Sequence, residues 1–298
     1  MPQQLKAGIL KSHCSMSASI ELADAIGGII GVSEKETISV HHPEKYNPTQ
    51  RFSARAKLYS KARPGYPQAA LDYIMVHCHL DKGSKVADLG AGTGISARAF
   101  AEQGCQVTAV EPNDAMLNEA VAHDQYKKQI TYVKATAENS TLPDKTYDAV
   151  VCAQAFHWFH PEQALKEFDR ILKPGGWVVL IWNERDESDA FTGEYGDLLR
   201  TLPDTSFVEV PRGTAGQALL NSDSFEEKGK SEFKNFQELD LDLFLGRAFS
   251  ASYAPDPDSP DALVFEEKLR GVFDSFAADD DQVVMKYICT VYTARKPS

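Results

Sequence analysis

Three glycines, Gly90, Gly92 and Gly94, stand close together in the segment VADLGAGTGISARAF at 86–100. A short apolar run precedes them and a stretch with helical spacing follows, so the segment predicts a strand, a sharp turn and a helix. Glycine adopts positive φ without a Cβ penalty, and its bare backbone lets a ligand come close. The N–H groups of the first helical turn then point at that ligand with the helix dipole behind them, which favours an anionic or carboxylate-bearing ligand end.

Strand and helix patterns alternate along the chain from about residue 66 to residue 183. Apolar runs typical of strands stand at 105–112, 130–135, 147–154 and 177–182, and helical spacing marks 67–78, 95–104, 114–123 and 161–172. Gly104 is placed to end the second of these helices and Asn113 to cap the third. The segment KPGG before the last strand predicts a turn. Such alternation is typical of βαβ crossovers in a parallel sheet that is covered on both faces.

The pattern changes after residue 183. Residues 185–230 mix helix and loop, 231–237 favours a strand, 239–252 and 262–277 favour helices, and 283–296 is a clear strand. We expect these late strands to join the same sheet. The predicted fold is α/β, a doubly wound, mostly parallel, Rossmann-like sheet with a helical lid and a closing antiparallel strand. Residues 1–45 predict a poorly ordered leader and 46–298 a single domain, with a core at about 66–184 and the lid and last strands at about 185–298.

The balance of charge limits the partners of the chain. Of its 298 residues, 43 are acidic and 31 are basic, which gives a net charge of −12. Because nucleic acids and anionic membranes are bound through Lys and Arg, we expect neither as a partner and expect a small-molecule substrate instead. No run of residues has the pattern of a membrane-spanning helix or a secretory signal. The sequence leaves the oligomeric state open.

Cysteine usage favours a reducing compartment. The five cysteines are scattered, odd in number and contain no CxxC pair: Cys14, Cys78, Cys105, Cys152 and Cys289. This pattern argues against a disulfide framework and against a Cys-rich zinc site, and no second His or acid stands at a spacing that supports a metal. We therefore expect a cytoplasmic protein without a metal ion.

An acid stands where the second strand of the glycine-containing unit ends. Glu111 follows Gly90 by 21 residues, a distance at which an acid is well placed for ribose hydroxyls. A glycine-rich turn alone is weak evidence, because many α/β turns need glycine merely to turn. The strand, the three glycines, the helix, the second strand and its acid together predict a nucleoside-containing cofactor at the carboxyl edge of a parallel sheet. Two cofactor classes stay open at this point, dinucleotides and S-adenosylmethionine.

Four ordered motifs carry a resemblance to a known family. The segments VADLGAGTG, VTAVEPNDAML, LPDKTYDAVVCAQAFHWF and ALKEFDRILKPGGWVVLIW resemble the first, second, fourth-strand and following motifs of class I S-adenosylmethionine-dependent methyltransferases. The match covers roughly residues 55–185 in register. The flanking segments YSKARPGYP and LFLGRAFSASYAP resemble a small-molecule branch similar to trans-aconitate methyltransferases.

The resemblance implies which residues hold the cofactor. Gly90, Ala91 and Gly92 would lie against the methionine moiety, Asp88 would reach its amino group through water, and Glu111 would take the ribose diol. The remaining cofactor positions are Arg63, Gly94, Pro112, Ala137, Glu138 and Gln154.

One position departs from the family pattern. Thr136 stands where an acid for the adenine amino group is common, so the backbone N–H of Ala137 would serve instead. Arg63, in KARPGYP, has two interpretations: a fork-like clamp on the methionine carboxylate or on a carboxylate substrate, or a surface arginine positioned by two prolines. Its neighbours Tyr59 and Tyr66 favour a segment that closes over the cofactor.

The segment AFHWFHPEQ offers a candidate catalytic group. His157 stands near the end of the fourth strand and titrates near neutrality, so it is a candidate general base. The alternative is a packed histidine beside Trp158 and Phe159 that bonds a backbone carbonyl. A carboxylate acceptor would need no base, whereas a hydroxyl or amine acceptor could need one.

The predicted substrate residues are Tyr59, Trp158, Arg247 and Tyr253. Arg247 and Tyr253 fall in the presumed lid and are placed to bind an anionic acceptor, or are simply a surface charge and a loop aromatic. The sequence thus predicts S-adenosylmethionine-dependent methyl transfer to a small molecule, with a carboxylic acid as one candidate. Its rivals are an NAD-dependent oxidoreductase and a noncatalytic protein that binds S-adenosylmethionine.

Overall fold

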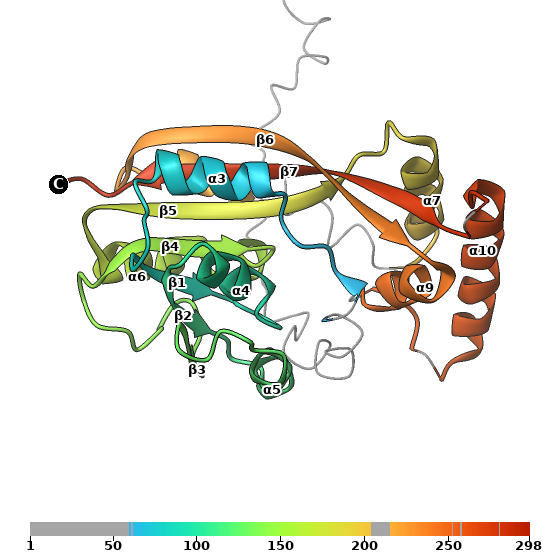
Figure 1. Cartoon of the computed structure of the whole chain (residues 1–298), viewed down its shortest axis with the longest axis horizontal. Helices are drawn as coiled ribbons and strands as arrows, with labels where there is room; N and C mark the ends of the chain where they lie inside the picture. The colour runs from blue at the N-terminus through green and yellow to red at the C-terminus, as the bar shows by residue number, and fades with distance from the viewer. Residues whose placement is uncertain (1–59, 61, 204–214, 252, 257, 280) are drawn as a thin grey trace, which may run out of the picture. The chain divides into compact units, whose positions relative to one another are not determined.

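The computed structural model describes residues 60, 62–203, 215–251, 253–256, 258–279 and 281–298. The predictions for the leader at 1–45 and for Tyr59 fall outside these residues. The described strands form one seven-stranded sheet in the order β3-β2-β1-β4-β5-β7-β6 (Figure 1). They are β1 (Lys85–Leu89), β2 (Gln106–Val110), β3 (Ile130–Val133), β4 (Tyr147–Ala153), β5 (Leu172–Arg185), β6 (Glu226–Leu239) and β7 (Val283–Arg295).

The direction of the strands confirms the predicted fold class. The strands β3, β2, β1, β4 and β5 pair in parallel. β7 then lies antiparallel to β5 on one side and to β6 on the other. Both late strands therefore belong to the same sheet as the parallel core, as expected.

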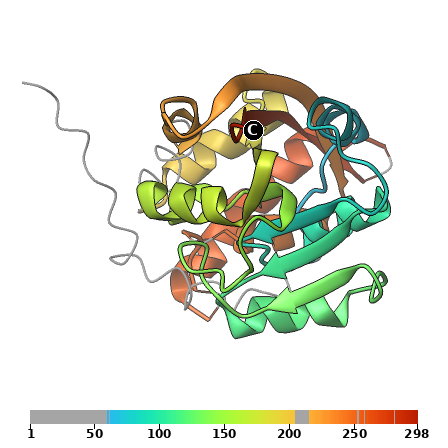
Figure 2. The ribbon, with the colours of Figure 1, turned by 90° about the vertical axis from the view of Figure 1, so that its left-hand side faces the viewer.

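Helices cover both faces of the parallel strands (Figure 2). α3 (Gln68–His77) and α4 (Ile95–Glu102) pack on one face and α6 (Pro161–Ile171) on the other. Successive residues of a strand serve opposite faces: in β4, Val151 packs with α3 and α4, whereas Val150 and Cys152 pack with α6. Because both faces are buried, these strands are apolar throughout.

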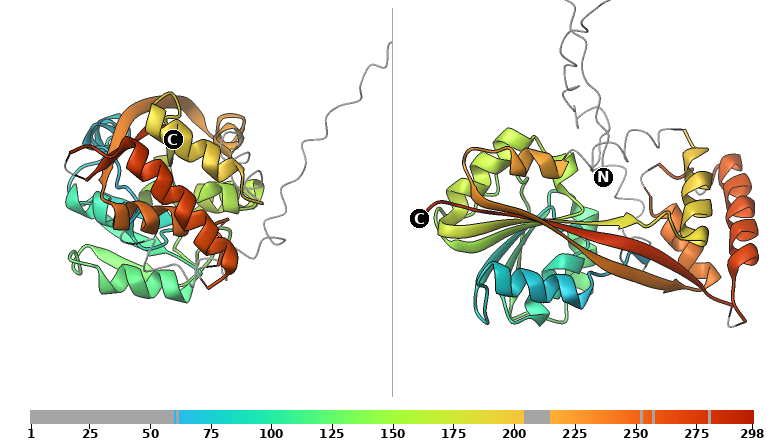
Figure 3. Two further views of the ribbon diagram at one scale, coloured as in Figure 1. Left: turned by 90° about the vertical axis from the view of Figure 1, so that its right-hand side faces the viewer. Right: turned by 90° about the horizontal axis from the view of Figure 1, so that it is seen from above.

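A second group of helices lies at the far end of β5, β6 and β7 (Figures 1 and 3). It consists of α7 (Ala190–Arg200), α9 (Leu241–Phe249) and α10 (Pro260–Phe276), and we refer to it as the helical cluster. Its apolar core includes Tyr195, Phe244 and Leu269, which are fully buried. α7 directly follows β5 and α9 directly follows β6, so the helical cluster stands at the carboxyl ends of these strands.

Two predicted helix boundaries agree with the structure, and one predicted turn differs from it. Asn113 caps α5 (Asp114–Ala122), because its side-chain oxygen accepts hydrogen bonds from the N–H groups of Ala115 and Met116. Gly104 has a φ of +94° just after α4. The segment KPGG, expected to be a turn, lies within β5, because the Gly175 N–H donates to backbone carbonyls at the end of the chain and extends the pairing with β7.

The described helices and cysteines add two properties of the chain. None of their helices combines the length and apolar character needed to cross a membrane. Cys78, Cys105, Cys152 and Cys289 are buried and carry free thiols.

Candidate active site

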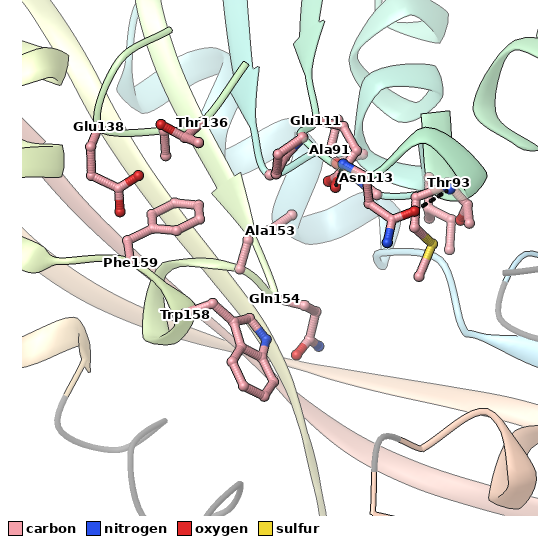
Figure 4. Close-up of a pocket in the computed structure, with 18 of the residues that line it drawn as sticks. Ala91, Thr93, Glu111, Asn113, Thr136, Glu138, Ala153, Gln154, Trp158 and Phe159 are labelled. Carbon is pink, nitrogen blue, oxygen red and sulfur yellow. Dashed lines mark hydrogen bonds between the residues drawn. The ribbon is translucent and has the colours of Figure 1, made fainter. Parts of the chain in front are cut away.

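A pocket of about 330 Å³ lies where β1, β2, β3 and β4 end (Figure 4). Figure 4 shows Ala91, Glu111 and Asn113 on one side of it and Glu138, Trp158 and Phe159 on the other. The predicted site residues that line it are Gly90, Ala91, Gly92, Glu111, Pro112, Ala137, Glu138, Gln154 and Trp158. The carboxyl ends of parallel strands are the usual place for a ligand in such a sheet.

The glycine turn after β1 supplies bare backbone to the pocket. Gly90 and Gly92 have φ values of +74° and +56°. A Cβ on Gly90 would lie 2.7 Å from the Cβ of Ala155 and 2.9 Å from the ring of Phe159, so this glycine permits the close approach of the opposite wall. A Cβ on Gly92 would meet no atom within 4 Å and would stand in open space. Gly92 is therefore the position where a ligand can approach the main chain.

Glu111 connects this turn to the next strand and helix. One carboxylate oxygen accepts from the N–H of Gly92 at 2.9 Å, and the other accepts from the N–H of Asn113 at 2.9 Å. Burial raises the pKa of Glu111, while these two backbone hydrogen bonds act in the opposite direction. The carboxylate is thus fixed at the pocket wall with its lone pairs only partly used.

Asp88 lies beneath the glycine turn and not in the pocket wall. It is fully buried, and one of its oxygens accepts from the Ser96 hydroxyl at 2.6 Å. Among the described residues, its other oxygen has no hydrogen-bond partner. Burial raises the pKa of Asp88 from 3.8 to about 7, and the nearby charge of Glu111 adds to the shift. An amino group or a water that reached this oxygen would satisfy it.

The wall opposite the glycine turn is largely aromatic. Phe159 and Trp158 line it at the end of the short helix η2 (Phe156–Trp158), and Phe156 and Phe159 meet edge to face with ring centroids 5.9 Å apart. Glu138 accepts from the backbone N–H of His160 at 3.0 Å and so ties the loop after β3 to this wall. Gln154, at the end of β4, has a φ of +58°. Of the six described non-glycine residues with a positive φ, Gln154 is the one that lines the pocket.

Gly94 and His157 also lie outside both walls of the pocket. Gly94 caps the start of α4 with a φ of +78°, and a Cβ there would meet Ala120 and Arg98, so its freedom serves the helix start and its packing. His157 is only 5% exposed, and the indole N–H of Trp182 donates to its Nδ1 at 3.3 Å. A neutral ring with Nδ1 occupied in this way carries its proton on Nε2. Neither nitrogen then has a lone pair for the substrate, which favours the packed histidine over the general base.

A smaller cavity adjoins the pocket and collects other predicted residues. It shares Tyr66, Ile95 and Gln154 with the pocket, and Arg63 and Arg247 line it. Arg63 also donates to the Ser250 side chain at 3.1 Å and to its carbonyl at 3.3 Å, which joins the segment before α3 to the end of α9. Tyr253 lies half-buried beside the helical cluster and lines neither cavity.

Sequence reasoning missed several residues of the site. The sequence patterns predict none of Phe159, Asn183, Arg185 and Tyr287 as site residues, yet all four line the cavities. Arg185 is the last residue of β5, just as Glu111 directly follows β2. A charged residue at the carboxyl end of a predicted parallel strand is a sequence signal for a site residue, and this signal could have identified Arg185. Tyr287 gives no such signal, because its position depends on the register of β7 against β5, in which it pairs with Arg185.

Comparisons with known proteins agree with this geometry. Residues 87–180 match a family described as a methyltransferase domain. An uncharacterized methyltransferase of Mycobacterium tuberculosis is 37% identical over 148 residues, half of this chain and 58% of that protein. An uncharacterized methyltransferase-like protein of Schizosaccharomyces pombe is 38% identical over 134 residues, 44% of this chain and 50% of that one. The chain thus spans 58% and 50% of the length of these two relatives.

A solved structure supports the fold. A candidate type II methyltransferase of Anaeromyxobacter dehalogenans superimposes with a TM-score of 0.58 at 24% identity, over 79% of this chain and 99% of that one. At this identity the likeness concerns the fold alone.

The buried carboxyl of Asp88 predicts a pH dependence of stability. Because its pKa rises to about 7 on folding, the folded state keeps a proton that the unfolded state loses above about pH 4. Its contribution to stability is therefore present in acid and falls as the pH rises from about 4 to about 7. Asp88→Asn should flatten this decline in melting temperatures between pH 4.5 and pH 8, whereas Asp72→Asn, on the exposed side of α3, should keep it. An unchanged slope in Asp88→Asn would contradict this assignment.

Proposed function

We propose that this chain, which carries an S-adenosylmethionine-dependent methyltransferase domain, is an enzyme that methylates a small molecule, and that its acceptor is a carboxylic acid. The domain match covers residues 87–180. One observation carries the proposal. The carboxylate of Glu111 and the bare backbone of Gly92 face one pocket at the carboxyl ends of β1 and β2.

The residues present fit the cofactor. Open space beside Gly92 admits a ligand to the backbone, Glu111 offers acceptors for a ribose diol, and Asp88 holds an unused buried oxygen near the turn. We assign Gly90 and Ala91 to the methionine end. Ala137 and Glu138, in the loop after β3, would border the adenine together with Pro112, which follows β2. Gln154 would face the reacting end of the cofactor.

The topology favours S-adenosylmethionine over a dinucleotide. A dinucleotide-binding sheet commonly has six parallel strands in the order 3-2-1-4-5-6. Here the strand beside β5 is the antiparallel β7, and β6 lies outside it. This arrangement argues against the NAD-dependent oxidoreductase.

When bound, S-adenosylmethionine would supply a methyl group carried on a positively charged sulfur; the acceptor's lone pair would form the new bond to that methyl carbon, and the electrons of the broken carbon–sulfur bond would stay on sulfur. The protein orients the acceptor and excludes water. Tyr66, Trp158 and Phe159 give the pocket an aromatic lining for this purpose. Correct orientation alone can lower a barrier by about 7–11 kcal/mol. A carboxylate acceptor has no proton to lose, so the site needs no general base, in keeping with the contact between His157 and Trp182.

The acceptor class rests on charge and on the flanking segments. A net charge of −12 disfavours nucleic acid as the substrate. The segments around Arg63 and Arg247 resemble the small-molecule branch similar to trans-aconitate methyltransferases, and we infer membership of that branch from them. The buried free thiols are in keeping with a reducing, cytoplasmic setting.

Transfer of a labelled methyl group tests the proposed activity. The protein is incubated with methyl-labelled S-adenosylmethionine and a metabolite extract, and labelled products are identified by mass spectrometry. We expect a small methyl ester. Binding of S-adenosylhomocysteine without any labelled product would instead support the alternative, a noncatalytic protein that binds S-adenosylmethionine.

A pair of glycine substitutions tests cofactor binding. Gly92→Ala places a Cβ in the open space of the pocket, whereas Gly83→Ala adds one at a comparable positive φ, +93°, outside the pocket and also without contacts. Both should cost about 1–2 kcal/mol of stability, because each forces a non-glycine residue into the left-handed region. Gly92→Ala should weaken S-adenosylhomocysteine binding in calorimetry by more than about tenfold, and Gly83→Ala by less than about twofold. Equal affinities of the two variants for S-adenosylhomocysteine would show that the ligand does not contact the turn at Gly92.

The role of His157 is tested by His157→Gln. Because its Nδ1 accepts from Trp182, we expect turnover to stay within about threefold of wild type and the pH profile to keep its shape. A general base would instead lose about 10²–10⁴-fold in turnover. Such a loss at unchanged melting temperature would make His157 catalytic and would contradict the packed assignment.

A further inference from the structure

The smaller cavity beside the pocket is lined by cationic side chains. Arg63, Arg185 and Arg247 line it, together with Asn183 and Tyr287. Of the described residues that line it, none is acidic, although Arg185 is paired with the carboxylate of Glu187 at 3.3 Å outside the lining. Although the chain has a net charge of −12, these arginines create a positive electrostatic potential in one small volume, which attracts anions.

Arg247 is the most deeply placed of these cations. Its side chain projects from α9 and is only 5% exposed. Its guanidinium is hydrogen-bonded to the Tyr287 side chain, but its Nε has no hydrogen-bond partner among the described residues, although guanidinium nitrogens at such depth are normally bonded. Removing a charge from water without a counter-charge is costly. The position therefore calls for an anion that the described residues do not supply.

A second buried polar group beside Arg247 points the same way. The hydroxyl of Tyr195, on α7, is fully buried and has no hydrogen-bond partner among the described residues. The charges of Arg247 and Arg185 both act on it, and the Arg185 guanidinium lies 5.8 Å from the centre of its ring. Two unsatisfied polar atoms in one neighbourhood favour a missing polar ligand over a local packing fault.

The position and size of the cavity define that ligand. It shares Tyr66, Ile95 and Gln154 with the pocket, which places it beyond the end assigned to methionine and away from Glu111. Its volume of about 30 Å³ holds about two water-sized atoms, since one water needs at least about 10–15 Å³. This is the size of an anionic end group and not of a whole metabolite. Two oxygens facing guanidinium forks match a carboxylate.

We propose that this cavity is the acceptor's carboxylate subsite, in which Arg247 and Arg185 hold an anionic end group of the substrate while its reacting atom stays in the adjoining pocket. The inference rests on the proposed methyltransferase function and names the residues that select its substrate. The carboxylate of the cofactor's methionine moiety is the other group that could fill this cavity. Its candidate partner is Arg63, in the segment before α3.

Ligands with and without a carboxylate separate the two sources. S-adenosylhomocysteine carries the amino-acid tail, whereas 5′-methylthioadenosine keeps the nucleoside and sulfur without it. We expect Arg247→Gln to bind both within about twofold of wild type in calorimetry. A loss of about tenfold or more for S-adenosylhomocysteine alone would assign the cavity to the cofactor and overturn the proposal. If the wild-type protein does not bind S-adenosylhomocysteine at all, the proposed methyltransferase function itself is contradicted.

The acceptor side is tested on the protein saturated with S-adenosylhomocysteine. Acetate, succinate and citrate are compared with acetamide and succinamide as probes, and the melting temperature is recorded. We expect at least one carboxylate to raise it where the amides do not, because a ligand that binds the folded state stabilises it. Arg247→Gln should lose this shift, and Arg270→Gln, at an exposed arginine paired with Glu266, should keep it. No shift in wild type, or an equal shift in Arg247→Gln, would overturn the proposal.

Two further variants guard against a folding defect. Arg247→Lys keeps the charge without the fork and should recover part of the carboxylate shift, which a merely structural arginine would not do. If Arg247→Gln does not fold, Arg185→Gln replaces it in the same comparison. With the acceptor found by labelled transfer, both Gln variants should raise its KM by about tenfold or more with a smaller change in kcat. An acceptor without an anionic group would overturn the proposal.

Discussion

The carboxylate of Glu111 is the contact on which the rest of the site depends. It bonds the N–H of Gly92 after β1 and the N–H of Asn113 at the start of α5, so it joins two successive strand-to-helix connections. Gly92 has no side chain to cover its N–H group, which is therefore open to the carboxylate of Glu111. Without this acceptor the donor would be left unsatisfied, which is costly. The same acid that shapes the pocket is thus the one that faces a ligand.

Two desolvated acids at the pocket, Glu111 in its wall and Asp88 beneath the glycine turn, carry an energetic cost that the fold retains. Asp88 and Glu111 are both buried, and burial raises the pKa of each. Asp88 keeps one oxygen without a partner among the described residues. A carboxyl that weakens the fold near neutral pH is hard to explain by packing alone. It is readily explained as preparation for a cationic or hydrogen-bonding ligand, such as an amino group.

Much of the core could be predicted from sequence because local patterns determine it. The glycine turn, the cap at Asn113 and the apolar run of β4 each follow from propensities within a few residues. The turn expected at KPGG failed because Gly175 bonds to the end of the chain, more than a hundred residues away. The role of His157 was left open for a similar reason, since its Nδ1 partner Trp182 lies on another strand. The small cavity depends on residues brought together only by the register of β7 and by the position of α9, which no local pattern records.

The smaller cavity draws on a part of the chain that the larger one does not use. Every residue of the larger one lies at or before His160, whereas Asn183, Arg185, Arg247 and Tyr287 of the smaller one lie on β5, α9 and β7. On the proposed assignments, changes at these four positions would alter which anionic group is held and would leave the lining of the larger pocket as it is.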